Sequence, residues 1–225
     1  MRPVALSASF VLLAAASAFA QAARLSGQAP RAGSWEIGGG VVYIQGFDMG
    51  DQSADLTRPG NDTLELFTTS SELKSVVGFQ GRLGFYFSPQ LSVEGGVRYA
   101  KPKLSIRITG DFENAPNETA EETLSQYLFD GSVLWHFGQS ATGGGVVPFV
   151  MGGAGYLREL HDAQELVETG VEYHAGAGVK IWFGSGGQRF GIRAEGGISV
   201  RDGGFDFEDK TRYTPVAAGS LIYLF

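Results

Sequence analysis

The stretch from Val171 to Phe183 reads VEYHAGAGVKIWF and repeats in character at every second residue. One set of alternate positions is apolar or aromatic throughout, whereas the other set includes Glu172, His174 and Lys180. Successive side chains of a β-strand point to opposite faces, and a helical period of 3.6 residues fits this pattern less well. The stretch therefore predicts a β-strand with one apolar face and one polar face.

Seven further segments of similar length flank this one, and seven of the eight keep the period of two. The exception is residues 147–157, which read VPFVMGGAGYL and alternate poorly. The eight predicted strands are residues 34–44, 77–87, 91–100, 125–137, 147–157, 171–183, 189–200 and 213–225.

The connections between these segments alternate in length. Short connections span residues 88–90, 138–146 and 184–188, and longer polar ones span residues 45–76, 101–124, 158–170 and 201–212. The longest, residues 45–76, carries Leu64, Leu66 and Phe67 among acidic residues, so we expect either a contact surface or a short hairpin that extends the fold. Segments of about ten alternating residues, joined by short and long connections in turn, are typical of a transmembrane β-barrel.

Aromatic residues gather at the ends of the predicted strands, while Gly, Ala, Val, Leu and Ile fill the middles of the apolar faces. A soluble β-sandwich would also alternate, but it has no reason to sort its aromatic residues into two belts. We therefore predict an all-β fold, an eight-stranded antiparallel up-and-down transmembrane β-barrel. One belt contains Trp35, Phe87, Trp135, Phe137, Phe149, Phe183, Phe190, Tyr223 and Phe225, and the other Tyr43, Tyr99, Tyr127, Tyr156, Tyr173 and Tyr213.

The N-terminus has the three parts of a signal peptide: a basic start, an apolar run and the sequence Ala18-Phe19-Ala20 before Gln21. We predict a signal peptide over residues 1–20, a short periplasmic tail over residues 21–32 and the barrel over residues 33–225; a buried N-terminal helix is the alternative. The chain has no Cys, which excludes disulfides and thiolate metal sites, and its net charge of −7 argues against nucleic acid as a partner.

Three stretches resemble the family of small eight-stranded outer-membrane barrels, a porin-like group that includes the transmembrane domain of outer membrane protein A. They are Trp135–Phe137 with Pro148–Tyr156, Arg193–Gly196, and the terminal Leu221–Phe225. The resemblance covers residues 33–225 and implies a cell-envelope protein of a Gram-negative bacterium that crosses the outer membrane several times, with both termini periplasmic. It also implies an assembly signal in Leu221, Tyr223 and Phe225 that is read by the outer-membrane assembly machinery. Outer-membrane lipid and lipopolysaccharide are the other expected partners, and a monomer is the expected state.

The polar faces of the predicted strands carry charges of both signs. An eight-stranded barrel is just wide enough for side chains to fill it, and buried charges persist only when they are paired. We expect a network of ion pairs that plugs the lumen, with Glu94 paired to Arg98 and Arg193 paired to Glu195. The predicted network contains Glu36, Arg82, Glu94, Arg98, Asp130, Lys180, Arg193 and Glu195, with His136 as a hydrogen-bonded filler on the same face.

Three functions are compatible with such a barrel. The first is a role in membrane integrity or in interactions made by the loops, the second is a narrow porin-like channel for ions or small solutes, and the third is an enzyme that modifies lipid A. The deacylase type of that enzyme has a His-x-Ser pair, but none of the three His residues here has Ser two positions later. We therefore expect no catalytic residues, no cofactor and no metal site, and we interpret Asp48, Asp51 and Asp55 as solvated charge rather than a calcium loop.

Overall fold

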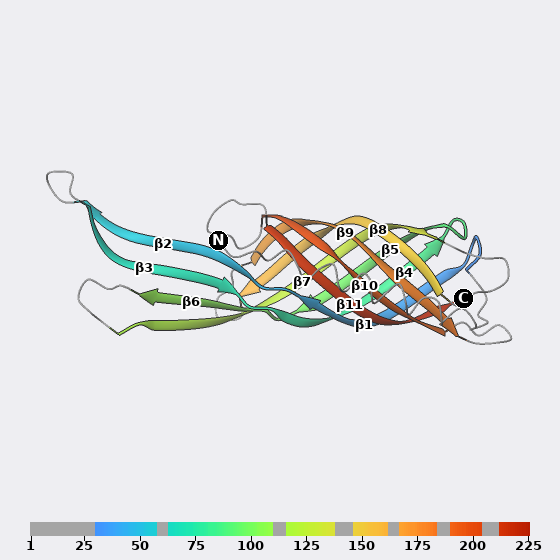
Figure 1. Ribbon diagram of the computed structural model, residues 1–225, viewed down its shortest axis with the longest axis horizontal. Coiled ribbons are helices and arrows are strands. Elements are labelled where there is room, and N and C mark those ends of the chain that lie inside the picture. Colours follow the sequence, from blue (N-terminus) through green and yellow to red (C-terminus); the bar gives the residue numbers. More distant parts are fainter. Residues whose placement is uncertain are drawn as a thin grey trace, which may run out of the picture.

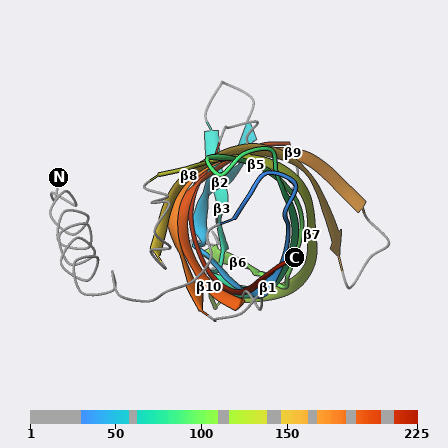
Figure 2. The same ribbon diagram turned by 90° about the vertical axis from the view of Figure 1, so that its right-hand side faces the viewer.

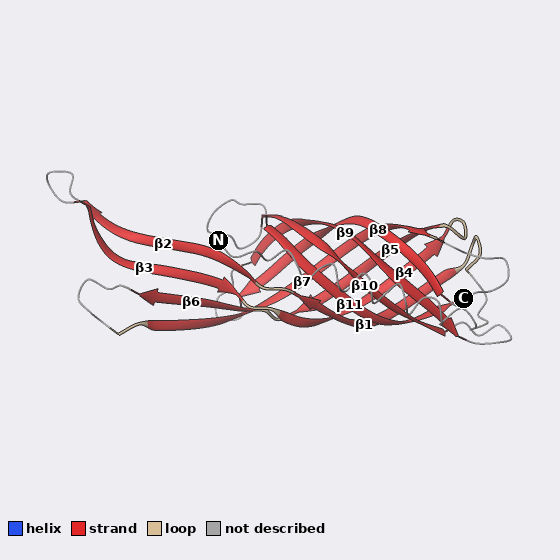
Figure 3. Cartoon of the chain, in the orientation of Figure 1, coloured by secondary structure: helices blue, strands red, loops and turns tan. Residues whose placement is uncertain are grey.

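The computed structural model describes residues 30–57, 63–109, 116–137, 146–161, 167–183, 190–203 and 212–225. The predicted signal peptide and residues 21–29 of the predicted tail lie outside these ranges, so both remain predictions. Every regular element in the described residues is a β-strand (Figure 3). No helix among them is long and apolar enough to cross a membrane.

Eight strands close into an antiparallel barrel, as the alternation predicts. Each pairs with its neighbour along the chain or across an insertion, and β1 closes the ring by pairing with β11 from Glu36↔Leu224 to Ile44↔Val216. Viewed along its axis, the barrel is a complete ring (Figure 2). The barrel strands are β1 (Trp35–Ile44), β4 (Val76–Tyr86), β5 (Leu91–Ala100), β7 (Glu118–His136), β8 (Val146–His161), β9 (Val167–Phe183), β10 (Phe190–Gly203) and β11 (Arg212–Leu224).

Three more strands lie where the sequence predicts long connections. They are β2 (Phe47–Thr57), β3 (Thr63–Leu73) and β6 (Lys103–Thr109), and together with the first residues of β7 they form a four-stranded sheet beyond the barrel. We call this sheet the extension; Figure 1 shows it projecting from one end of the barrel. The expectation of loops over residues 45–76 and 101–124 was therefore wrong, whereas the alternative of a hairpin extending the fold is what the structure has.

The connections 158–170 and 201–212 were also predicted too long. Strands β8 and β9 stay paired to Leu160↔Val167, and β10 and β11 stay paired to Arg201↔Arg212. The side chains of Glu159 and Arg201 are buried there, at 4% and 6% exposure. These strand segments therefore pack against the barrel interior, and their backbone groups are paired between strands. The barrel wall is consequently longer than the alternation alone indicates.

The two ends of the barrel differ. Strands β1 and β11 meet at one end, where the amide of Trp35 donates to the carbonyl of Phe225 at 2.8 Å. The tight turn between β4 and β5 lies at the same end and is held by the amide of Leu91, which donates to Ser88 Oγ at 3.0 Å. We call this the terminal end, and we call the opposite end, from which the extension projects, the extension end.

Glycines on the inner face make room for long side chains. A Cβ at Gly96 would lie 2.3 Å from a carboxylate oxygen of Asp130, and a Cβ at Gly153 would lie 2.7 Å from Nε2 of His174. Outward glycines differ, because a Cβ at Gly152 would meet nothing closer than 3.8 Å. The inward glycines therefore decide which side chains can reach across the lumen.

Candidate functional site

The lumen near the terminal end holds a compact set of charged residues, which we call the proximal layer. Its centre is Lys180, which is fully buried and donates to both carboxylate oxygens of Glu36 at 2.9 Å and to Glu94 at 3.1 Å. The hydroxyl of Tyr86 donates to Glu36 at 2.6 Å and also accepts from Lys180 at 3.0 Å. A buried ammonium group thus has all three of its N–H donors engaged, which is the condition for keeping it charged in the lumen.

Two arginines complete the proximal layer. Arg193 lies 2.7 Å from Glu94 and 2.5 Å from Glu195, and its guanidinium stacks over the ring of Phe149 at 4.7 Å. Arg82 binds the other oxygen of Glu195 at 3.0 Å. The layer therefore balances three cations against three carboxylates: Arg82, Lys180 and Arg193 against Glu36, Glu94 and Glu195.

A second set, the distal layer, lies toward the extension end. Glu172 is fully buried and accepts from Arg98 at 3.1 Å and from Arg201 at 3.2 Å. Arg201 also donates to Gln126 at 3.3 Å and lies 3.9 Å from Glu159. Two cations and two carboxylates again cancel, so each layer is electrically neutral.

One of the two ion pairs predicted from the sequence forms in the structure. Arg193 and Glu195 are brought together, but Glu94 and Arg98 are not partners among the described residues. They are four positions apart on one strand, roughly 13 Å along it, so each reaches across the lumen instead. Glu94 binds Lys180 and Arg193, and Arg98 binds Glu172.

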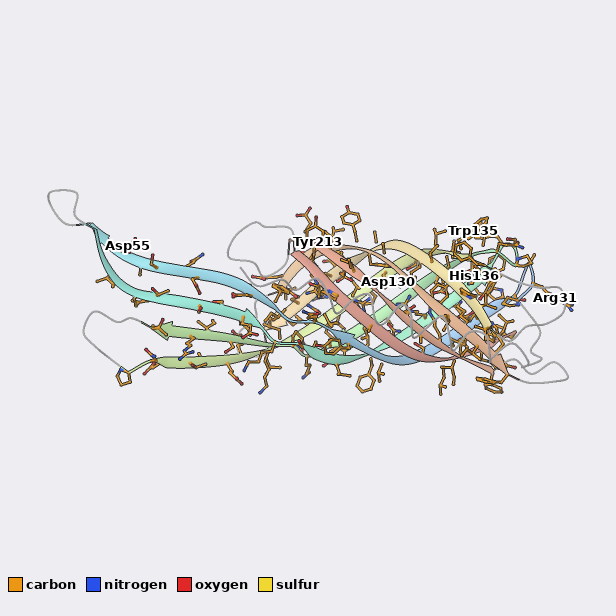
Figure 4. The ribbon with its side chains drawn as sticks, viewed as in Figure 1. Arg31, Asp55, Asp130, Trp135, His136 and Tyr213 are labelled. Atoms are coloured by element: carbon orange, nitrogen blue, oxygen red, sulfur yellow. The ribbon has the colours of Figure 1, made fainter. Side chains whose placement is uncertain are left out.

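Asp130 belongs to neither layer. Its half-buried carboxylate projects over Gly96, midway along the barrel (Figure 4). His136 is 1% exposed and packs between the rings of Tyr86 and Phe149, at 5.2 and 5.9 Å. Neither ring nitrogen has a hydrogen-bond partner among the described residues, so His136 fills the terminal end by packing alone, and the prediction of a hydrogen-bonded filler was wrong.

A small cavity of about 20 Å³ separates the layers and is lined by Arg82, Arg98, His174, Glu195 and Met151. This volume holds one or two water molecules. Nε of Arg82 and Nε of Arg98 have no protein partner in the described part of the chain. A water in the cavity is the natural acceptor for such donors.

Clusters of buried apolar side chains lie on both sides of the charged layers. The cluster at the terminal end contains Tyr86, Val147, Trp182, Ile222 and Leu224. Val42, Ile44 and Ala100 pack together toward the extension end, and Met49, Leu73, Leu104 and Leu124 pack at the root of the extension. The poor alternation of residues 147–157 has its cause here, because apolar side chains take inward positions. Val147 packs in the cluster at the terminal end, and the ring of Phe149 lies beneath the guanidinium of Arg193.

The comparison with known families agrees with this geometry. A family model described as the outer membrane protein beta-barrel domain matches residues 8–215. The chain belongs to the outer-membrane protein β-barrel domain family. It is therefore a multi-pass protein of the outer membrane, as the alternation and the aromatic belts predict.

Three solved structures with a similar fold are distant from this chain in sequence. OprG of Pseudomonas aeruginosa is 12% identical with a TM-score of 0.48, over 87% of this chain and 97% of that one. Ail of Yersinia pestis is 13% identical with a TM-score of 0.44, over 86% of this chain and 99% of that one. The N-terminal barrel domain of OprF from P. aeruginosa is 13% identical with a TM-score of 0.42, over 87% and 100%. No curated protein matches the chain significantly.

The outer surface of this family member carries the two predicted aromatic belts. Trp135 and Tyr213 project outward at opposite ends of the barrel (Figure 4), with exposed fractions of 50% and 70%. The residues of the predicted assembly signal also face outward on β11 or directly after it, where Leu221 and Phe225 are 72% and 58% exposed. One residue assigned to a belt is misplaced: Phe149 is 1% exposed and lies inside, because β8 turns an apolar face to the lumen.

Serine and histidine do meet in this barrel, although no local His-x-Ser pair exists. Ser132 on β7 and His174 on β9 lie in one cross-strand row with Gly153 between them, and Ser132 Oγ is 2.8 Å from His174 Nε2. Nδ1 of His174 has no hydrogen-bond partner among the described residues, whereas a hydrolytic triad needs a group that orients the histidine there. No three His, Asp or Glu side chains of the described ranges are placed to share a metal ion.

Three members of the distal layer were missed in the sequence. Glu159 and Arg201 fell within predicted connections, and Glu172 was placed on the polar face of its strand but not in the network. The signal that identifies Glu159 and Arg201 is the same alternation carried one or two residues further along each strand, and Glu172 already lies in its predicted strand; all three share the inward parity of their neighbours.

Proposed function

We propose that this outer-membrane barrel is a closed scaffold rather than a conduit, and that its role in membrane integrity or interaction is carried by the extension. The observation that supports this is the filled lumen. Two neutral layers of buried ion pairs lie between apolar clusters, and the cavity between the layers holds only about 20 Å³. A channel for solutes needs a continuous polar path, and a single-sign lining would favour ions of opposite charge.

Conductance in a planar bilayer tests this proposal. The purified protein should give no discrete, reproducible openings at voltages at which a porin of known conductance opens in the same bilayer. Reproducible unitary steps would overturn the closed-scaffold proposal in favour of the narrow channel. A variant with Glu94→Gln and Arg193→Gln, in which the proximal layer loses one acid and one cation, would show whether such steps pass through the lumen.

We further propose that the terminal end faces the periplasm and the extension end faces the cell exterior. Short turns on the periplasmic side and long connections outside are the rule for these barrels, and an even strand number puts both chain ends on one side. The absence of Cys from the sequence makes a clean test possible. On intact cells, a membrane-impermeant maleimide should label Ser53→Cys in the extension and leave Ser88→Cys in the β4–β5 turn unlabelled; the reverse pattern would refute the orientation.

The partners proposed for this scaffold follow from its surfaces. The apolar outer wall contacts outer-membrane lipid, and lipopolysaccharide is the lipid next to the extension if that end is outside. Leu221, Tyr223 and Phe225 are proposed as the signal for the assembly machinery. We propose no enzymatic activity, because the Ser132–His174 pair faces the filled lumen, whereas a lipid substrate would lie on the outer wall.

A further inference from the structure

One face of the extension carries two parallel rows of polar residues. Directly opposed residues of antiparallel strands point to the same face, so each row can be read from the pairing register. A bulge between Asp48 and Gly50 on β2 brings Asp48 and Asp51 to the same face, although they are three positions apart. The first row is Asp48, Glu72, Ser105 and Glu121, and the second is Asp51, Ser70, Arg107 and Thr119.

The rows line a polar cavity of about 360 Å³. Its walls include Asp48, Glu72, Lys74 and Arg107, together with the hydroxyls of Ser70, Ser105 and Thr119. This volume lies within the range of small-molecule sites, roughly 300–1,000 Å³. Because four paired strands supply the lining, the site is built on regular backbone rather than on loops.

Several lining groups are held in place by neighbours. The amide of Gly50 donates to Asp48 Oδ1 at 2.9 Å, and the hydroxyl of Ser70 donates to Asp51. Lys74 is tied to Glu121, which also accepts from Lys103 at 3.2 Å. These contacts fix the rim of the cavity before any ligand arrives.

Two charged groups at the centre are uncommitted. Arg107 and Glu72 are exposed, and neither forms an ion pair within the part of the chain that the structure describes. They sit on neighbouring strands in adjacent rows, so one ligand can contact both. The centre of the site thus offers a cation and an anion in diagonal positions of neighbouring strands, about 7–8 Å apart along the sheet, among hydroxyls.

This combination selects a particular ligand chemistry. A guanidinium group binds phosphate through two parallel hydrogen bonds, and carboxylates accept hydrogen bonds from hydroxyl groups. A bare phosphate would be repelled by Glu72 and Asp48, and an uncharged sugar would leave Arg107 unused. We propose that the polar face of the extension binds a phosphorylated saccharide, with the phosphate on Arg107 and the sugar hydroxyls on Glu72 and Asp48.

Two sources could supply this chemistry: the phosphorylated sugars of lipopolysaccharide, or a soluble sugar phosphate. Only the first depends on the proposed orientation, because lipopolysaccharide reaches the cavity only if the extension is outside. In a nanodisc both barrel ends are open to solution, so a ligand can reach the cavity whichever end faces the cell exterior. A failure of this proposal can therefore be told apart from a failure of the proposed function.

The first experiment titrates the whole protein in phosphatidylcholine nanodiscs with glucose 1-phosphate, glucose and inorganic phosphate, and follows binding by NMR. Glucose 1-phosphate should bind at least tenfold more tightly than either fragment. Arg107→Gln should weaken its binding at least tenfold, whereas Arg158→Gln, the same change at an exposed arginine of β8 outside the cavity, should leave it unchanged. Glu72→Gln should weaken glucose 1-phosphate but strengthen inorganic phosphate, because a repelling charge is removed.

The heat-induced shift in electrophoretic mobility checks that every variant is folded. No saturable binding of glucose 1-phosphate, or equal effects of Arg107→Gln and Arg158→Gln, would overturn the proposal. A second arm adds lipopolysaccharide to the nanodiscs. Competition with glucose 1-phosphate supports the membrane lipid as the natural source, and binding without competition supports a soluble sugar phosphate.

Discussion

Replacing Lys180 by Met tests whether the lumen is held by balanced charge. Lys180 donates to Glu36, Glu94 and the hydroxyl of Tyr86, and it is fully buried. Arg193 still neutralises Glu94 in the variant, but its nearest approach to Glu36 is 4.0 Å. Glu36, which is 3% exposed, would then keep the hydroxyl of Tyr86 as its one close donor among the described residues. Removing one partner of a buried ion pair costs about 3–5 kcal/mol, roughly a 10²- to 5 × 10³-fold loss in the folding equilibrium.

The double variant Lys180→Met with Glu36→Gln separates charge from packing. The proximal layer then regains neutrality, so the double variant should lose no more than about 1–2 kcal/mol, less than Lys180→Met alone. Stability would be measured by guanidinium unfolding of the refolded barrel in lipid vesicles, followed by tryptophan fluorescence. Lys103→Met provides the matched control, because Lys103 is 56% exposed and exposed ion pairs contribute little. A loss of stability in the double variant equal to the sum of the losses in the two single variants would refute the role of charge balance. A loss below about 1 kcal/mol for Lys180→Met would refute it as well.

Three further outcomes can be measured on the same preparation. Gly153→Ala should lower the free energy of unfolding by about 1–3 kcal/mol in the same assay, since its Cβ would lie 2.2 Å from the carbonyl oxygen of Gly131. Gly152→Ala should leave the stability unchanged, because its Cβ would have no neighbour closer than 3.8 Å. Leu104→Ala should cost about 2–5 kcal/mol of local stability at the root of the extension. Hydrogen exchange should then become faster in β2, β3 and β6 while the barrel strands keep their usual rate. An equal increase in exchange rate in all strands would contradict a separate cluster at the root. The pKa of Glu121 is held below its usual range by hydrogen bonds from Lys74 and Lys103. The contribution of Glu121 to the stability of the extension is therefore present above the pKa of the unfolded state and is lost as the pH falls through the pKa of the folded state. An NMR titration in which Lys74→Met leaves the pKa of Glu121 unchanged would disprove this cause.

The barrel could be predicted because its surroundings impose a period of two. Lipid on one side and a charged interior on the other make every barrel strand alternate, except β8, whose inward-facing Val147 and Phe149 are themselves apolar. The extension could not be predicted in this way. Both faces of β2 over residues 50–55 and of β3 over residues 66–70 contact water, so polar residues such as Asp51 and Gln52 follow one another without alternation.

The candidate site shows the same division between local and long-range information. Parity along each strand identified the inward charges, because it depends only on sequence neighbours. The partners depend on which strands face each other after closure: Glu36 and Lys180 are 144 positions apart. Both predicted pairs lie within single strands, and only Arg193 with Glu195, two positions apart, forms.

The balanced layers also constrain how the protein can enter a membrane. Glu36 on β1 is neutralised by Lys180 on β9, Glu94 on β5 by Arg193 on β10, and Arg98 on β5 by Glu172 on β9. No hairpin of neighbouring strands contains these pairs, so a half-built sheet would expose single charges to hydrocarbon. Insertion and ring closure must then occur as one cooperative event, and a barrel stalled with β1 unpaired from β11 would be expelled or degraded instead of persisting as a stable intermediate.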